Sequence, residues 1–106
     1  MTHELAITEL RYILCRAMGM REAEARVEKL VASGYLLVED ASVLTASAAD
    51  IKCERALSLP DCFTLSLAKR LYVPCLFAKR ERELTAETER KDFDIDIAYL
   101  EDYVTD

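Results

Sequence analysis

Two short apolar runs, at residues 35–40 and 72–78, constrain the fold more than any other feature of the sequence. Apolar residues at helical spacing predict helices around these runs, at residues 4–18, 21–33, 42–56, 59–71 and 80–90. A third run, at residues 93–100, alternates apolar and acidic residues over its first five positions, as a half-buried strand does, and a helical tail follows. Helices that alternate with strands predict crossover connections and a parallel sheet covered on both faces. The expected fold class is therefore α/β, in a chain that starts on a helix.

The composition is typical of one folded, helix-rich domain. The chain has 106 residues, of which 52% are hydrophobic, and only two are Gly and two are Pro. This length fits a single domain, 1–106, with a C-terminal tail at about 92–106. The net charge of −6 disfavours a nucleic-acid binder that relies on phosphate contacts alone. A metal-dependent enzyme is compatible with this charge, because its site needs local carboxylates and the metal supplies the positive charge.

The cysteine pattern argues against a structural zinc site. None of the four cysteines forms a C-x-x-C pair, and the single histidine, His3, lies near the start of the chain. Cys15, Cys62 and Cys75 lie among apolar residues and are interpreted as buried thiols. The sequence shows neither a signal peptide nor an apolar run of about 18 residues, so we expect a cytoplasmic, reduced protein without a membrane span.

Glu9 lies on the apolar side of the first predicted helix. In a helix, its neighbours three and four positions away include Leu5, Tyr12 and Ile13. An ionised carboxylate in such a setting needs a metal ion, a cation or hydrogen bonds. Two interpretations are open: a boundary glutamate paired with Arg16 or with a cation from another helix, and a metal ligand.

Asp61 opens a helix that is otherwise almost entirely apolar. The run Ser58-Leu59-Pro60-Asp61 fits a capping box, in which Ser58 is the N-cap and Asp61 faces the positive end of the helix dipole. The start of a helix beside a parallel sheet is also where ligand-binding groups gather. A helix cap and a ligand-binding role are therefore both open for Asp61.

Three cations, Lys79, Arg80 and Arg82, follow the second predicted strand. Cations oppose the dipole at a helix N-terminus, so Lys79 and Arg80 do not stabilise the helix that follows. They could contact phosphate, as an RNA-binding cluster, or pair with Glu39 and Asp40, and the sequence favours pairing. The later acids are interpreted as solvated positions of a strand and a tail: Asp94, Asp96, Glu101 and Asp102.

The segment AADIKCERALSLPDCFTLSLAKRLYVPCLFAKREREL, residues 48–84, resembles the C-terminal half of a PIN domain. The matching features are Ala48-Ala49-x-Ile51-Lys52, Leu57-Ser58-Leu59-Pro60-Asp61 and the apolar strand Val73-Pro74-Cys75-Leu76-Phe77. Upstream, a run is similar to the family's helix that carries its second acidic residue: Thr8-Glu9-Leu10 followed by Arg16 and Gly19. The resemblance extends over roughly residues 5 to 85.

This resemblance implies a three-layer α/β/α sandwich around a short parallel sheet, and an endoribonuclease that depends on Mg²⁺ or Mn²⁺. Such enzymes include the toxins of toxin–antitoxin pairs, so RNA and an antitoxin protein are the implied partners. In the family, acidic side chains at the carboxyl ends of strands bind the metal, which activates water for hydrolysis of RNA phosphodiesters. By position, Glu9 matches the second acid and Asp61 the third. These two are the expected catalytic and metal-binding residues.

Two departures from the family bear on activity. The family's first strand, which ends in its first metal-binding Asp, has no counterpart before the helix that carries Glu9. The family's fourth acid falls at about Lys79, which is a cation here. Glu9 and Asp61 alone are few ligands for a hard cation that takes about six oxygen atoms. The alternative function is therefore an inactive PIN remnant that serves as a protein-interaction module.

The absent strand also predicts a gap in the sheet. In the family this strand lies in the middle, between strands equivalent to residues 35–40 and 73–78. Its removal leaves two strand edges with unpaired backbone groups. Either those strands close up against each other, or another chain fills the gap, or the sheet pairs across a homodimer, and a homodimer is the expected outcome.

Overall fold

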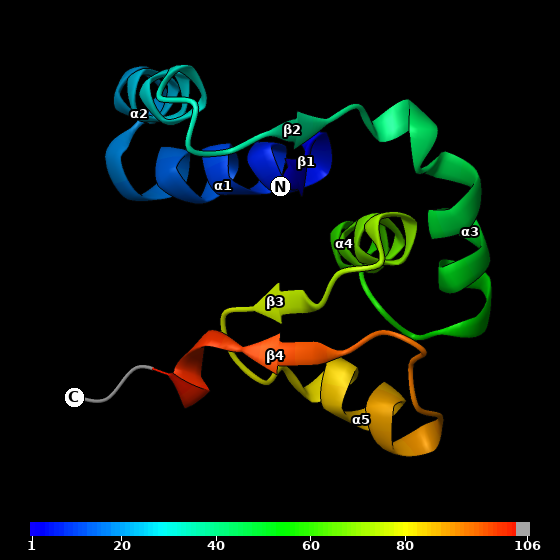
Figure 1. Cartoon of the computed structure of the whole chain (residues 1–106). Helices are drawn as coiled ribbons and strands as arrows, with labels where there is room; N and C mark the ends of the chain where they lie inside the picture. Colours follow the sequence, from blue (N-terminus) through cyan, green and yellow to red (C-terminus); the bar gives the residue numbers. More distant parts are fainter. Residues whose placement is uncertain (104–106) are drawn as a thin grey trace.

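Helix α4 (Leu59–Leu71) lies at the centre of the computed structural model, which describes residues 1–103 (Figure 1). The other helices are α1 (Glu4–Met18), α2 (Met20–Ala32), α3 (Thr45–Glu54) and α5 (Arg82–Arg90). The strands are β1 (Thr2–His3), β2 (Val38–Glu39), β3 (Cys75–Phe77) and β4 (Ile97–Tyr99). Two short 3₁₀ turns follow β2 and β4, at Ala41–Val43 and Leu100–Asp102. Of the helices in the described residues, none has the length and apolar character to span a membrane.

The strands form two parallel pairs. β1 pairs with β2, with Thr2 opposite Val38, and β3 pairs with β4, with Cys75 opposite Ile97. Figure 1 shows β1 and β2 beside α1 and α2 on one side of α4, and β3, β4 and α5 on the other side. Within residues 1–103 no strand pairing joins the two sheets. The predicted α/β class with parallel strands is confirmed, and the strands divide into two small sheets.

The predicted helices agree with the structure more closely than the predicted strands do. Helix α4 has the predicted bounds, residues 59–71. The apolar runs 35–40 and 72–78 contribute only the two residues of β2 and the three residues of β3. The prediction that the chain starts on a helix is wrong, because Thr2 and His3 pair with β2 before α1 begins.

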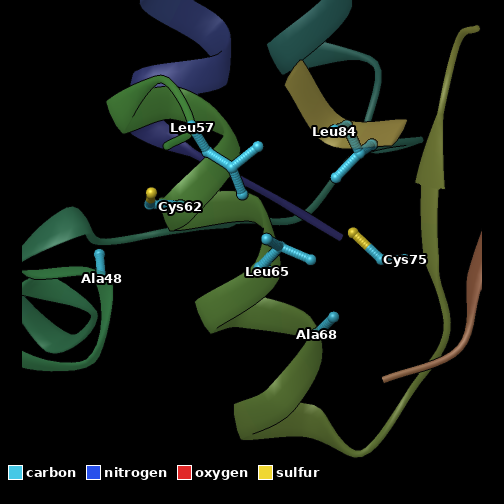
Figure 2. Packing of buried hydrophobic residues seen from close by; sticks show 7 residues of the cluster. All are labelled: Ala48, Leu57, Cys62, Leu65, Ala68, Cys75 and Leu84. Atoms are coloured by element: carbon cyan, nitrogen blue, oxygen red, sulfur yellow. The ribbon is translucent and has the colours of Figure 1, made fainter. Parts of the chain in front are cut away.

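Helix α4 is central because it buries side chains on several sides. Leu65 and Ala68 project from α4 toward Cys75 on β3, whereas Cys62 projects toward Ala48 on α3 (Figure 2). Leu57 and Leu84 complete this buried cluster. Burial of each large apolar side chain stabilises the fold by about 1.5–3 kcal/mol. The cluster therefore fixes α3, β3 and α5 around α4.

The four cysteines are all free thiols. Cys62 and Cys75 are buried, as predicted. Burial, together with the nearby charge of Asp61, raises the pKa of Cys75 to about 12, so this thiol is protonated at neutral pH. The prediction for Cys15 is wrong in degree, because its side chain is only half-buried on α1.

A buried guanidinium ties α3 to α5 and to the loop that leads to β4. Arg55, the C-cap residue of α3, donates hydrogen bonds to the carbonyl oxygens of Glu87, Lys91 and Asp92. Its guanidinium also lies 3.9 Å from the centre of the Phe93 ring. A planar group with five N–H donors can satisfy several carbonyl oxygens at once, which an ammonium cannot do in the same geometry.

We predict that Arg55→Met lowers the free energy of unfolding by about 3 kcal/mol, because it leaves buried carbonyl oxygens without donors. Arg55→Lys should recover only part of this loss, since the lysine ammonium lacks the planar fork. Urea unfolding followed by circular dichroism measures both effects. The matched control is Arg26→Met, whose exposed partner is Glu22, and its cost should stay below about 0.5 kcal/mol. Equal costs for Arg55→Met and Arg26→Met would contradict this role.

His3 connects β1 to both α1 and α4. Its Nδ1 atom accepts a hydrogen bond from the backbone N–H of Ala6 at 3.1 Å, so the imidazole caps α1. Its Nε2 atom lies 2.7 Å from the hydroxyl oxygen of Thr64 on α4, and that hydroxyl donates to the carbonyl oxygen of Pro60. This chain of bonds requires a neutral ring with the proton on Nε2. Burial lowers the pKa of His3 below its ordinary value, which favours this neutral form.

We predict that the free energy of unfolding falls as the pH drops from about 7.5 to about 5.5. The unfolded chain takes up a proton on His3 near pH 6.5, whereas the folded chain does so only at lower pH, so acid favours unfolding. Urea unfolding across this range measures the effect, and NMR titration of the single histidine should give a pKa below 6.5. His3→Asn keeps a capping side chain without a titrating ring and should lose most of this pH dependence. An unchanged pH dependence in His3→Asn would refute the assignment.

Candidate functional site

A groove of about 460 Å³ lies between the two sheets. Its floor is formed by the apolar face of α4, and the strands β1 and β3 form its two walls. The lining residues come from the start of the chain, from α4 and from β3: Met1, Thr2, His3, Ala6, Thr64, Leu67, Ala68, Leu71, Val73, Pro74, Cys75 and Leu76. We call this feature the inter-sheet groove.

The walls of the inter-sheet groove are the inner strands of the two sheets. β2 and β4 contribute no lining residue, so they occupy the outer side of each pair. Each inner strand uses one edge to pair with its outer partner. The other edges of β1 and β3 border the groove, and within residues 1–103 they are not paired with each other. The gap predicted between residues 35–40 and 73–78 is not found in that form, because β1 precedes α1 and pairs with β2; the strands of residues 1–103 that are left unpaired with each other are β1 and β3.

Asp61 lies where its capping role requires. Its backbone N–H donates to the hydroxyl oxygen of Ser58 at 3.3 Å, so the predicted N-cap of α4 is present. Burial raises the pKa of the Asp61 carboxyl, the Ser58 hydroxyl lowers it, and the charges of Glu81 and Glu83 raise it further. Asp61 is thus a half-buried acid in the first turn of α4, and the charges of Glu81 and Glu83 act on it.

Glu9 occupies the middle of α1, where its side chain is half-buried. The alternative of a pair with Arg16 is not realised, because the Arg16 guanidinium lies 5.2 Å from the centre of the Tyr12 ring instead. In residues 1–103 no three carboxylate, thiol or imidazole side chains converge closely enough to hold a metal ion. The described residues therefore do not by themselves fit a magnesium or manganese site.

The cations after β3 pair with acids, but not with the acids expected. The Arg80 guanidinium donates to both carboxylate oxygens of Asp102 at 2.7 and 2.8 Å and to Glu101 at 3.2 Å. It also lies 4.3 Å from the centre of the Tyr99 ring. Pairing with Asp102 raises the pKa of Arg80 and lowers that of Asp102. The predicted partners Glu39 and Asp40 were wrong, because Arg80 joins β3 to the turn after β4.

Lys79 and Arg82 remain at the surface. The Lys79 ammonium lies 4.0 Å from the Glu81 carboxylate, and both side chains are largely exposed. Arg82 is the exposed first residue of α5. Of the three predicted RNA-binding residues, Arg80 is therefore paired with acids, whereas Lys79 and Arg82 are exposed.

His3 is the residue of this site that the sequence analysis missed. The sequence suggested only that a lone histidine does not bind zinc. A signal was available, because His3 directly precedes the regular apolar spacing of α1, the position where a capping side chain is needed. The bond from His3 to Thr64 could not be inferred, since it joins residues 61 positions apart.

Comparisons with protein-family models, with curated proteins and with solved structures find no match for this chain.

Proposed function

We propose that this chain is a PIN-like interaction module that does not cleave RNA by itself. One observation carries the proposal: an apolar groove separates two parallel strand pairs whose inner edges are unpaired within residues 1–103. In a PIN-like three-layer sandwich the strands would form one continuous sheet between helices. An incomplete sheet of this kind supports a role in which another polypeptide completes it.

The distribution of acids supports the same proposal. Glu9 and Asp61 lie on different helices, and no third ligand in residues 1–103 joins them in a metal-binding group. Lys79 occupies the approximate position of the family's fourth acid and adds a positive charge there. The carboxylates that remain are too few for a hard divalent cation.

A second candidate is a metal-dependent endoribonuclease whose site is completed by another chain, such as a second copy of this one. The raised pKa of Asp61, with Glu81 and Glu83 nearby, favours it, because an added cation would relieve the repulsion among these acids. Mg²⁺ or Mn²⁺ would be the cofactor, RNA the substrate, and an antitoxin or a second copy of the chain a partner.

The test is RNA cleavage by the purified full chain. We predict that the chain with Mg²⁺ or Mn²⁺ degrades a labelled single-stranded RNA no faster than the same chain with EDTA. Glu9→Ala, Asp61→Ala and the control Glu28→Ala, an exposed acid on α2, should give the same low rate. Metal-dependent cleavage that is lost in Glu9→Ala and Asp61→Ala but kept in Glu28→Ala would overturn the module and establish the nuclease.

A further inference from the structure

We propose that α1 is the interface between two copies of this chain, which pair antiparallel about a two-fold axis. In this dimer the Glu9 carboxylate of each copy binds the Arg16 guanidinium of the other copy. Tyr12 and Ile13 of both copies pack together between the two ion pairs. This interface is distinct from the inter-sheet groove, so it goes beyond the interaction module proposed above.

Helix α1 has the composition of a core helix without the burial of one. Its 15 residues include Leu5, Leu10 and Leu14, yet none of the 15 is buried within the described part of the chain. The shorter helix α4, with 13 residues, buries Leu65 and Leu67 among others. Figure 1 shows α1 packed beside α2 on one side of α4. An apolar helix that is left this accessible is suited to association.

One stripe of α1 carries Glu9, Tyr12, Ile13 and Arg16. Their spacing of three, one and three residues places them on one face of the helix, with Glu9 and Arg16 about 10.5 Å apart along its axis. Tyr12 and Ile13 are 48% and 51% exposed, although both are large and apolar. The stripe therefore presents two apolar side chains between an acid and a base.

The four charged side chains of α1 differ in their partners. Arg11 lies 3.8 Å from Glu24 of α2, and Glu4 accepts a hydrogen bond from a backbone N–H of the turn after β2. Glu9 and Arg16 form no ion pair within residues 1–103, and the Arg16 guanidinium rests near an aromatic ring instead. The charges of α1 that still lack a partner of opposite sign are thus the two that flank the apolar side chains.

A two-fold axis makes these charges complementary to themselves. If the axis passes between Tyr12 and Ile13, positions 9 and 16 are equally far from it, so Glu9 of one copy faces Arg16 of the other. The same contact forms twice, as it does in every two-fold dimer. Parallel helices would instead place Glu9 against Glu9 and Arg16 against Arg16, which costs free energy. The charges therefore select the antiparallel arrangement.

The net charge of −6 on each copy opposes their approach but acts at longer range. At an ionic strength of about 0.15 M, interactions between exposed charges are largely screened beyond about 8 Å, whereas the atoms of an ion pair lie about 3 Å apart. A second copy also carries the matching charges at the matching spacing by symmetry. For this reason the stripe selects the same chain rather than an unrelated protein.

Sedimentation equilibrium of the full chain at about 0.15 M salt tests the interface. We expect a dimer. Glu9→Arg and Arg16→Glu should each weaken dimerisation about tenfold or more, because like charges then face each other at both pairs. The matched control is Glu89→Arg, an exposed acid on α5, on the other side of α4 (Figure 1). It changes the net charge as Glu9→Arg does and should not weaken the dimer.

A mixture of the two single variants gives the sharpest result. When a Glu9→Arg chain meets an Arg16→Glu chain, opposite charges face each other at both pairs. The mixture should therefore form a heterodimer about as stable as the original dimer, although neither variant dimerises well alone. The double variant Glu9→Arg/Arg16→Glu should dimerise as well, and because it contains both substitutions, it also controls for damage to the fold.

The apolar centre of the interface is tested separately. Ile13→Glu should abolish the dimer, because it buries a carboxylate between the two ion pairs. Its matched control is Val43→Glu, on the turn after β2, since Val43 is 47% exposed and Ile13 is 51% exposed. Val43→Glu should dimerise like the original chain. Thermal unfolding of the two variants should be similar, since neither side chain is buried.

Four results would each overturn the α1 interface: a monomer at every concentration, no heterodimer in the mixture, a dimer that survives Ile13→Glu, or equal weakening by Glu89→Arg. The RNA assay tests the proposed function independently. A chain that neither dimerises nor cleaves RNA removes only this interface. A dimer with metal-dependent cleavage removes only the proposal that the chain does not cleave RNA by itself.

Discussion

The packing of α4 is the constraint on which the other elements depend. Neither strand pair is long enough to be stable alone, because two-stranded sheets of two or three residues bury little surface. Leu65 and Ala68 pack α4 against β3, and the hydroxyl oxygen of Thr64 accepts a hydrogen bond from the ring of His3 on β1. The helix thus provides the apolar support that the short strands cannot give to each other. A helix that supports elements on several sides has to be apolar on more than one side. This explains why Asp61 lies in the first turn of α4.

The helices could be predicted from the sequence because their signals are local. The Ser58 cap and the apolar spacing after it define α4 within a few residues of chain. The strands could not be predicted to the same degree, since their length depends on a distant partner. The run 35–40 is apolar, yet Tyr35 is 90% exposed and only Val38 and Glu39 find partners, in β1. A strand as short as β1 carries no periodicity at all.

The features of the candidate site also differ in how far the sequence predicts them. The capping role of Asp61 followed from the sequence, because it depends on local chemistry, whereas the expected gap beside residues 35–40 did not, because β1 pairs with β2 there. The partners of Arg80 did not follow, because Glu101 and Asp102 lie 21 and 22 positions away and look like solvated acids in the sequence. The hydrogen bond from His3 to Thr64 could not be predicted for the same reason, because the two residues are 61 positions apart. Contacts across the chain depend on the packing of whole elements, which no short motif reports.

Separate sheets also have a mechanical consequence. Within residues 1–103 no ladder of backbone hydrogen bonds links β1 to β3, so their spacing is set by side chains that rest on α4. Van der Waals contacts of this kind are individually weak, whereas a hydrogen-bonded ladder resists separation along its whole length. The distance between the two sheets therefore depends on side chains packed on α4 and on the bond from His3 to Thr64. A substitution on α4 could change the width of the groove without breaking any backbone hydrogen bond within either sheet.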